Sequence, residues 1–323
     1  MMKKMLILAS LVALTLVGTP AVEAETNTNT ATPYADIAGH WAEKEIEKCY
    51  IAGAVGTSGD FRPDEAVTRI ELLTMFVKAK GIEPVQTNQS SFKDIPADSW
   101  MTPYAEIAYR LGIVHGQKQG KDIYLRPNEP VQREELVSML IRSAGNSGAV
   151  NQLKWSTTVQ ALAKFPDGNR IQEADQRPFV YALQNGMMNA YADGTLQPQK
   201  LMTRAEAATY AAFHLLPGKA SEQKTLANGT SYRQVMTVQT TAYSYATDKI
   251  LSYLEYPLRE GVVAVDPKII PLGSHLYIEG YGYAVAADIG GAVKDQHVDL
   301  YLPTLSDAEN YGLKKGVQVF LLD

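Results

Sequence analysis

The chain has 323 residues, of which 46% are hydrophobic and 20% charged, so it is long enough for two or three domains with buried cores. Its formal net charge of -5 excludes an electrostatic footprint for nucleic acid, because no basic stripe is present to displace the counterions of a phosphate backbone. We therefore expect no nucleic-acid partner, and any anionic polymer must be met by local arginines.

Residues 1–24 have the pattern of a secretory signal peptide. Lys3 and Lys4 precede an apolar stretch over 6–17, and the segment ends at Ala24, where a signal peptidase reads small residues. The apolar stretch is shorter than the roughly 20 residues of a transmembrane helix, and no later segment is long and apolar enough. The sequence predicts a secreted chain with no transmembrane segment after signal cleavage. A retained N-terminal anchor is the alternative.

The one cysteine, Cys49, excludes an intramolecular disulfide. It lies in an amphipathic stretch after Trp41, which favours a buried core thiol over a nucleophile. Stability outside the cell must then come from packing.

Residues 34–216 restate one pattern three times. Each copy has an aromatic residue two positions before an aspartate, then a glycine, then a proline, and closes on an arginine that is followed by a glutamate. The aspartates are Asp36, Asp94 and Asp167, the glycines Gly53, Gly112 and Gly186, and the prolines Pro63, Pro127 and Pro198. Each unit predicts a helix, a glycine turn, a short extended piece and a second helix.

The start of each second helix carries the chemistry of the repeat. Thr68 with Glu71, and Thr203 with Glu206, predict capping boxes. Gln132 stands at the equivalent place in the second repeat, so we expect that helix to lack its cap. The arginine after each cap opposes the helix macrodipole, which indicates an external anion bound by the guanidinium and the helix N-terminus together. A solvated or salt-bridged surface arginine is the alternative.

These repeats resemble the surface-layer homology family, over about 33–82, 91–145 and 160–217 of a module spanning 33–217. The resemblance implies a largely helical three-fold module that binds a secondary cell-wall polymer carrying pyruvate. By position, the polymer-binding residues would be Arg69, Arg133, Arg204, Trp41 and Trp100. The third repeat lacks the equivalent tryptophan.

Residues 218–232 are polar and lose the helical period, which predicts a short flexible linker. From 233 to 323 the period becomes two, which predicts short strands over 236–243, 262–265, 275–278, 283–287, 298–302 and 317–322. Six short strands favour a closed barrel. One helix interrupts them, with a capping box from Ser306 to Glu309.

Three aspartates lie at the edges of these strands. Asp266 precedes a proline and Asp288 lies just before two glycines, so a turn-forming role is the alternative for both. Asp299 lies inside an apolar strand, where a carboxylate that faces the barrel must be paired or protonated. A perturbed ionisation of that kind is typical of functional sites.

The run 286–294, the downstream Asp299 and the upstream segments around Thr241 and Asp266 resemble the three-aspartate (3D) domain shared with membrane-bound lytic transglycosylase A. The resemblance implies a double-psi β-barrel over 233–323, with Asp299 as the catalytic acid and Asp288 and Asp266 in support. Like-charge repulsion from Asp288 is expected to raise the pKa of Asp299.

The resemblance also implies that Thr241, Tyr243 and Tyr301 bind substrate, although ordinary barrel packing is the alternative for the two tyrosines. Asp295 departs from the glycine that the family usually has after the lysine. His297 and Lys294 are expected to be structural or surface residues.

No metal or cofactor is implied. The histidines at 40, 115, 214, 275 and 297 form no ligand spacing with cysteine or carboxylates, and the sequence has neither a phosphate loop nor a Gly-x-Ser-x-Gly element.

The sequence thus predicts a multidomain chain, with a mainly α three-fold module followed by an all-β double-psi barrel. The implied function is a peptidoglycan-cleaving enzyme of lytic transglycosylase type, anchored in the bacterial cell wall, that cuts the MurNAc–GlcNAc glycan with one catalytic aspartate. One alternative is a hydrolytic glycosidase in which Asp288 or Glu279 activates water. The other is a non-catalytic wall-binding or surface-layer structural protein.

Overall fold

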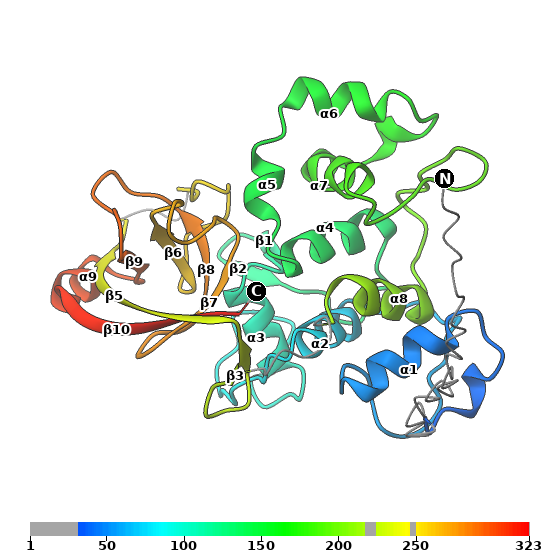
Figure 1. The fold of residues 1–323 in the computed structure, drawn as a ribbon, viewed down its shortest axis with the longest axis horizontal. Coiled ribbons are helices and arrows are strands. Elements are labelled where there is room, and N and C mark those ends of the chain that lie inside the picture. The colour runs from blue at the N-terminus through cyan, green and yellow to red at the C-terminus, as the bar shows by residue number, and fades with distance from the viewer. Residues whose placement is uncertain (1–31, 217–223, 246–249, 323) are drawn as a thin grey trace, which may run out of the picture. The chain divides into compact units, whose positions relative to one another are not determined.

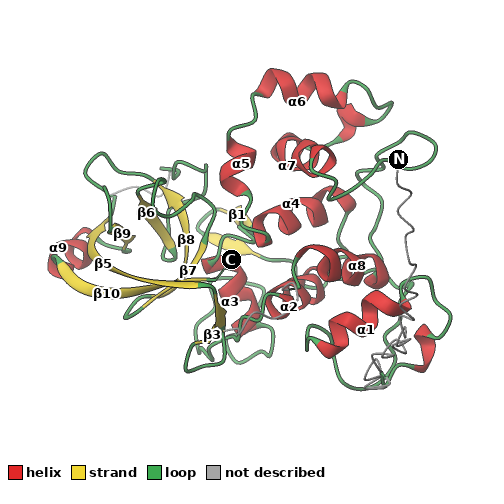
Figure 2. Cartoon of the chain, in the orientation of Figure 1, coloured by secondary structure: helices red, strands yellow, loops and turns green. Residues whose placement is uncertain are grey.

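The computed structural model describes residues 32–216, 224–245 and 250–322 (Figure 1). The predicted signal peptide over 1–24 lies outside these ranges. Up to residue 216 the regular elements of the described chain are helices and one short hairpin, and from residue 224 they are strands and one helix (Figure 2). Within the described ranges, the helices are all too short or too polar to cross a bilayer.

The helices are α1 (Glu43–Ile51), α2 (Arg69–Ala79), α3 (Thr102–Arg110), α4 (Arg133–Ser143), α5 (Ser147–Asn151), α6 (Trp155–Leu162), α7 (Glu173–Gln184), α8 (Arg204–His214) and α9 (Leu305–Tyr311). Two 3-10 helices, η1 (Ala35–Ile37) and η2 (Gly168–Arg170), begin the first and third repeats.

Each repeat contains the two predicted helices, which are α1 and α2 in the first repeat, α3 and α4 in the second, and α7 and α8 in the third. The glycine that ends each first helix, Gly53, Gly112 or Gly186, has a positive φ, which glycine adopts without strain. The second repeat adds a hairpin of β1 (Gln117–Gln119) and β2 (Asp122–Tyr124). Helices α5 and α6 form an insertion that the repeat pattern does not predict.

The aspartate that opens each repeat stabilises a left-handed residue ahead of the proline. The Asp36 carboxylate accepts hydrogen bonds from the amides of Phe61 and Arg62, at 3.0 and 2.6 Å. Asp94 and Asp167 make the same pair of bonds to 125–126 and 196–197. The second residue of each pair has φ between +47° and +58°, at Arg62, Arg126 and Gln197. A non-glycine residue rarely adopts this conformation, so the recurring aspartate has the structural role of stabilising it.

Three backbone hydrogen bonds close a ring where the repeats meet. Val67 donates to Met202, Met202 donates to Val131, and Val131 donates back to Val67, at 2.9, 2.9 and 3.0 Å. All three side chains are fully buried. Each repeat therefore completes the backbone hydrogen bonding of another.

The second helix of each repeat begins at the predicted arginine, but its first amides are not free. In α2 the amides of Arg69 and Ile70 donate to the carbonyls of Glu129 and Pro127 in the second repeat. Helices α4 and α8 make the equivalent bonds to the third and first repeats, at Lys200, Pro198, Glu65 and Pro63. Neighbouring repeats thus take the first two amides of each of these helices, so these amides are not free to bind an external anion.

The predicted capping boxes at Thr68 and Thr203 are confirmed. The second repeat also forms the box, because the Glu135 carboxylate accepts a hydrogen bond from the Gln132 amide at 2.9 Å. The expectation that this helix lacks its cap is wrong: the glutamate three residues on supplies the contact whichever side chain precedes the helix.

The C-terminal region forms the predicted closed barrel of six strands, in the order β10, β5, β9, β6, β8, β7. The strands are β5 (Gln234–Tyr243), β6 (Val262–Val265), β7 (His275–Ile278), β8 (Gly282–Asp288), β9 (His297–Tyr301) and β10 (Lys314–Leu321). Two pairs are parallel, β5 with β9 and β6 with β8, and pairing of β10 with β7 closes the barrel. Val263, Val298, Leu300 and Val319 are among the residues that fill its core.

Helix α9 is capped by Thr304 and not by Ser306. The Thr304 hydroxyl accepts a hydrogen bond from the Asp307 amide at 3.0 Å. Thr304 is extended, as an N-cap residue must be, whereas Ser306 already lies inside the helix.

The second half of the predicted linker is an ordered hairpin of β3 (Lys224–Thr225) and β4 (Ser231–Tyr232). Its turn contains Asn228 and Gly229, a sequence that favours tight turns. Thr230 is fully buried and its hydroxyl lies 2.6 Å from that of Tyr283 in the barrel. Buried hydrogen bonds therefore hold a segment whose polar composition predicts flexibility.

The barrel and the repeats share a buried interface. Tyr283 and Leu322 belong to the same buried apolar cluster as the cores of the first two repeats. A methyl group added at Gly148 in α5 would lie 2.3 Å from the carbonyl oxygen of Leu272 in the barrel. Neither region can therefore be removed without exposing apolar surface of the other.

Candidate active site

Four residues on neighbouring strands form one row across the barrel. Thr241 of β5 pairs with Asp299 of β9, Asp299 pairs with Ala264 of β6, and Ala264 pairs with Asp288 of β8. Neighbouring strands lie about 4.8 Å apart, so the backbones of Asp299 and Asp288 are about 10 Å apart. The small methyl group of Ala264 is the side chain that separates the two acids.

Asp299 lies on the outer face of the barrel. Val298 and Leu300, on either side of it, belong to the barrel core, and side chains alternate along a strand. Asp299 is nevertheless only partly exposed, and burial raises the pKa of its carboxyl group. Like-charge repulsion from Asp288 raises this pKa too, as predicted, but burial is the main cause.

One oxygen of Asp299 is engaged and the other is open. Its Oδ1 accepts a hydrogen bond of 2.6 Å from the Thr241 hydroxyl, a contact that lowers the pKa and opposes burial. Among the described residues, no donor lies within hydrogen-bond distance of Oδ2. An acid with a raised pKa and an open oxygen can give a proton to a bound group and later take one back.

Asp288 ends β8 and is held by three donors. Its Oδ1 accepts hydrogen bonds from the backbone amides of Tyr253 and Ile289, both at 2.9 Å, and its Oδ2 accepts one from the Tyr243 hydroxyl at 3.0 Å. Asp288 therefore serves as an acceptor in this arrangement and is fixed in place by two loops and a strand.

Asp266 has a turn-forming geometry. Its carboxylate accepts hydrogen bonds from the amides of Lys268 and Asp295, both at 3.0 Å, and these bonds lower its pKa. The second bond ties the loop before β9 to the end of β6. Asp295 itself has φ +55°, in the left-handed region where glycine is free of strain, which accounts for the glycine usual at that place.

The two tyrosines form an aromatic pair beside the acids. Tyr243 and Tyr301 face each other across β5 and β9 with ring centroids 5.5 Å apart. Burial and the charge of Asp288 raise the pKa of the Tyr243 phenol, so it stays a hydrogen-bond donor. Tyr301 is itself largely buried.

His297 contacts the row through Thr241, although the sequence favoured a structural or surface role for it. Its Nε2 lies 2.8 Å from the Thr241 hydroxyl, whose proton goes to Asp299. Since the hydroxyl donates to Asp299, it accepts from His297, which gives a chain from His297 through Thr241 to Asp299. The sequence could have indicated this contact, because His297 and Asp299 are two residues apart on one strand and so share a face.

The three repeat arginines are all partnered inside the chain. Arg69 contacts Glu135 at 2.7 Å and Arg204 contacts Glu71 at 2.6 Å, so each reaches the capping glutamate of another repeat. Arg133 donates to the Tyr191 hydroxyl at 2.9 Å and to the carbonyl of Asn189. Trp41 and Trp100 are 63% and 59% exposed, so their rings are open to a ligand.

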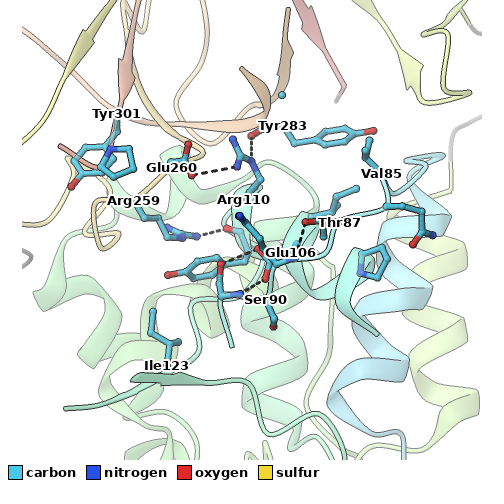
Figure 3. A pocket seen from close by; sticks show the side chains of 18 of the residues that line it. Val85, Thr87, Ser90, Glu106, Arg110, Ile123, Arg259, Glu260, Tyr283 and Tyr301 are labelled. Atoms are coloured by element: carbon cyan, nitrogen blue, oxygen red, sulfur yellow. Dashed lines mark hydrogen bonds and ion pairs between the residues drawn. The ribbon is translucent and has the colours of Figure 1, made fainter. Parts of the chain in front are cut away.

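A cavity of about 790 Å³ lies between α3 and the barrel, away from the row of acids. Arg110 lies on its wall and donates to the carbonyl of Tyr283 at 3.1 Å, with Glu260 4.0 Å away (Figure 3). Of the predicted site residues, Tyr301 alone lines it. This cavity joins the repeats to the barrel but does not contain the predicted chemistry.

Comparison with known families matches both regions of the chain. The S-layer homology domain matches residues 33–73, 91–137 and 164–208, and the 3D domain matches residues 261–323. The repeats and the relatives described next make the chain a secreted protein of the cell surface, associated with the wall. The 3D domain match covers all strands of the barrel except β5.

Individual relatives match parts of the chain. The cell wall-binding protein YocH of Bacillus subtilis is 58% identical over 53 residues, which are 16% of this chain and 18% of the relative. An S-layer protein of Bacillus licheniformis is 30% identical over 178 residues, 54% of this chain and 19% of that protein. The chain thus spans only about a fifth of the length of these relatives. Among solved structures, Escherichia coli MltA with bound chitohexaose is 27% identical, covering 22% of this chain and 27% of that one, with a TM-score of 0.20.

Proposed function

We propose that this protein cuts the glycan strands of peptidoglycan by a lytic transglycosylase reaction, while its repeats bind a secondary cell-wall polymer. The observation that carries the proposal is Asp299. It is partly buried on an outer face, its pKa is raised, and one oxygen is open to a ligand beside Thr241. We also propose that the barrel is of the double-psi type and that the repeats form one mainly α module.

The reaction needs one group that first gives and then accepts a proton. Protonated Asp299 gives its proton to the glycosidic oxygen that links N-acetylmuramic acid to the next sugar. The resulting carboxylate then takes the proton of the muramic 6-hydroxyl, whose oxygen closes on C1 to give a 1,6-anhydro sugar. The attacking hydroxyl belongs to the same sugar, so it is already at high effective concentration and no water is consumed.

The surrounding residues have distinct roles in this scheme. Thr241, backed by His297, stabilises the Asp299 carboxylate once the proton has left. Tyr243 and Tyr301 supply the aromatic wall on which a sugar can lie, as the pair beside the acids. Asp288 holds Tyr243 by its hydroxyl, and Asp266 holds the loop before β9.

Hydrolysis is the second candidate, because Asp288 lies one strand away from Asp299. The backbone separation of about 10 Å leaves room for a water between two carboxylates, as inverting glycosidases require. Glu279 does not fit that role. It follows β7 at the end of the barrel where β8 begins, whereas Asp288 lies at the end of β8.

The test is digestion of purified peptidoglycan by the full-length secreted chain, with Asp299→Asn as the matched variant. The full chain is needed because the barrel shares a buried cluster with the repeats. We expect anhydro-muropeptides from the wild type and a loss of about 10²- to 10⁴-fold in the variant, the usual contribution of a general acid or base. Reducing-end products would instead indicate hydrolysis, and no products would leave a non-catalytic wall-binding protein.

Anchoring is supported by charge around Arg69. A cavity of about 280 Å³ is lined by Arg69, Arg126 and Arg142 together with Glu135 and Asp175. Three guanidinium groups around one small cavity suit an anionic group such as the carboxylate of a pyruvylated sugar. The similarity to YocH, a cell wall-binding protein, also supports attachment to the wall.

The anchoring test is sedimentation with purified walls. We expect Arg69→Ala combined with Arg204→Ala to reduce the bound fraction, and Lys48→Ala, which removes an exposed cation on α1, to leave it unchanged. Circular dichroism identifies loss of fold, since Arg69→Ala removes the ion pair of Glu135, and Arg204→Ala leaves Glu71 only its longer ion pair with Arg62. Retained wall binding by a folded double variant contradicts the role of these arginines.

A further inference from the structure

A tight turn over residues 251–257 lies between the barrel and the repeats. Leu251 and Pro257 form a bridge at its base, and the Ser252 amide donates to the Tyr256 carbonyl at 2.8 Å. Glu255 has φ +63°, a left-handed conformation that a non-glycine residue keeps only where its surroundings demand it. The turn is therefore held in a defined shape.

One side of the turn is bonded to the candidate active site. The Tyr253 amide donates to Asp288 Oδ1 at 2.9 Å, and the next amide, that of Leu254, donates to the carbonyl of Ala287 at 2.9 Å. Leu254 and Tyr256 also pack in a small buried cluster with Val262, Val285 and Ala287. The position of the turn thus sets where one of the three donors to Asp288 lies.

The other side of the turn is bonded to the repeats. The Tyr256 hydroxyl donates to Ser147 Oγ of α5 at 2.7 Å, and the Tyr256 ring lies 4.3 Å from that of His115. The ring also covers Gly112, where an added methyl group would lie 2.6 Å from it. Tyr256 is thus inserted into the second repeat.

A charged contact attaches the turn to the third repeat as well. Arg177 of α7 donates to the Glu255 carboxylate at 3.0 Å, with the arginine side chain the more buried of the two. Between these points the turn is one wall of a cavity of about 800 Å³, whose other walls include Trp155, Glu173 and Pro178. The turn is therefore attached to the repeats by a few separate contacts and is not packed against them throughout.

We propose that the S-layer homology repeats position Asp288 through the 251–257 turn, with Tyr256, Glu255, Ser147 and Arg177 as positioning residues. The proposal rests on the proposed function for the catalytic use of the site. Its physical content is separate: contacts made by the anchoring module hold the amide of Tyr253 against the carboxylate of Asp288. The module that binds the wall then also completes the site that acts on it.

The effect reaches the surroundings of Asp299 through the Tyr243 side chain. Asp288 accepts from Tyr253 with one oxygen and from Tyr243 with the other. If the turn moves, Asp288 loses a donor and its bond to Tyr243 must readjust. Tyr243 packs on Tyr301 beside Asp299, so the shape of the site changes without any change in its own residues.

The experiment uses the full-length secreted chain and two variants that remove the same hydrogen bond from opposite sides. Tyr256→Phe removes the donor and keeps the ring, and Ser147→Ala removes the acceptor. Arg177→Met removes the charged contact, Arg177→Lys is its conservative counterpart, and Lys48→Met, which breaks an exposed pair on α1, is the control.

The first measurement is hydrogen exchange of the Tyr253 amide, which the bond to Asp288 protects. We expect exchange to be faster by about fivefold to tenfold in Tyr256→Phe and in Ser147→Ala, the size of one hydrogen bond. Combining Tyr256→Phe with Ser147→Ala should not increase the exchange rate further, because both remove the same hydrogen bond. Arg177→Met should also speed exchange of the Tyr253 amide, and Arg177→Lys should keep most of the wild-type protection. Unchanged Tyr253 exchange in folded Tyr256→Phe and Ser147→Ala chains would overturn the proposal.

The second measurement is peptidoglycan cleavage by the same chains. We expect kcat to fall as the exchange rate of the Tyr253 amide rises, while KM and the wall-bound fraction stay constant. A kcat that is unchanged in variants with a faster-exchanging Tyr253 amide also overturns the proposal. If the wild type releases no product, it is the proposed function that fails, and the exchange experiment still decides whether the repeats position Asp288.

Discussion

The Thr241 hydroxyl donates to Asp299 Oδ1 over 2.6 Å, and His297 stands 2.8 Å behind the same hydroxyl. Parallel pairing of β5 with β9 puts the threonine and the aspartate directly opposite each other. A side chain far upstream in the sequence thus lowers the pKa of the candidate catalytic acid, against the larger effect of burial, which raises it.

Replacing Thr241 by valine keeps the shape and removes the donor. The pKa of Asp299 should rise further, because the hydrogen bond from Thr241 lowers it in the wild type. We expect the alkaline limb of the pH–rate profile to move to higher pH and kcat to fall by about tenfold, a typical cost of one charge-assisted hydrogen bond. Thr240→Val is the matched control, since Thr240 contacts Tyr311 on the other face of β5.

The raised pKa of Asp299 also predicts how stability depends on pH. Burial favours the neutral acid, so the folded chain keeps this proton to a higher pH than the unfolded chain, whose value is near 3.8. The contribution to stability is complete below 3.8 and is lost as the pH rises through the folded pKa. Asp299→Asn should therefore melt at a higher temperature than the wild type at pH 7, and the difference should shrink toward pH 3.8; a lower melting temperature at pH 7 would argue against this reading.

Asp295 offers a test of backbone conformation. Because its φ is +55°, Asp295→Gly should fold normally, whereas a β-branched residue cannot adopt that conformation without strain. Asp295→Val should lower the free energy of unfolding by about 1–2 kcal/mol. Chemical denaturation compares the two, and equal stabilities would contradict the assigned conformation.

Cys49 should be unreactive in the folded protein. The thiol is fully buried, donates to the carbonyl of Ala208 at 3.3 Å, and has its pKa raised by burial to about 12. A thiol-specific reagent at pH 8 should therefore label it only after unfolding, because the thiolate is the reactive form. Rapid labelling of the native chain would show that α1 opens easily.

Local patterns predicted the elements well. Short runs rich in apolar residues predicted the strands 262–265 and 275–278 with the bounds that the structure has, and the threonine caps predicted the starts of α2 and α8. The place of Asp299 inside an apolar strand was also enough to predict a carboxyl group with a perturbed pKa. These features depend on residues close together in the chain.

Long-range contacts account for what the sequence could not predict. The amides at the start of α2 are bonded to Pro127 and Glu129, residues whose position beside α2 no local pattern indicates. The hairpin within residues 224–232 is held by a hydrogen bond to Tyr283, which lies far along the chain. The face of β9 that carries Asp299 becomes part of the candidate site only because β5 and β6 lie on either side of it. No local sequence pattern predicts the turn over 251–257, because contacts with both the barrel and the helical region hold it.

The ring formed by Val67, Met202 and Val131 also affects how the chain can assemble. Its members come from three repeats, and the last of them follows the first by most of the length of the module. A chain made and exported from its N-terminal end cannot complete the first repeat until the third has emerged, so folding is delayed until nearly the whole module is outside the cell. Export in an unfolded state, which secretion requires, is therefore favoured by the connectivity of the fold itself.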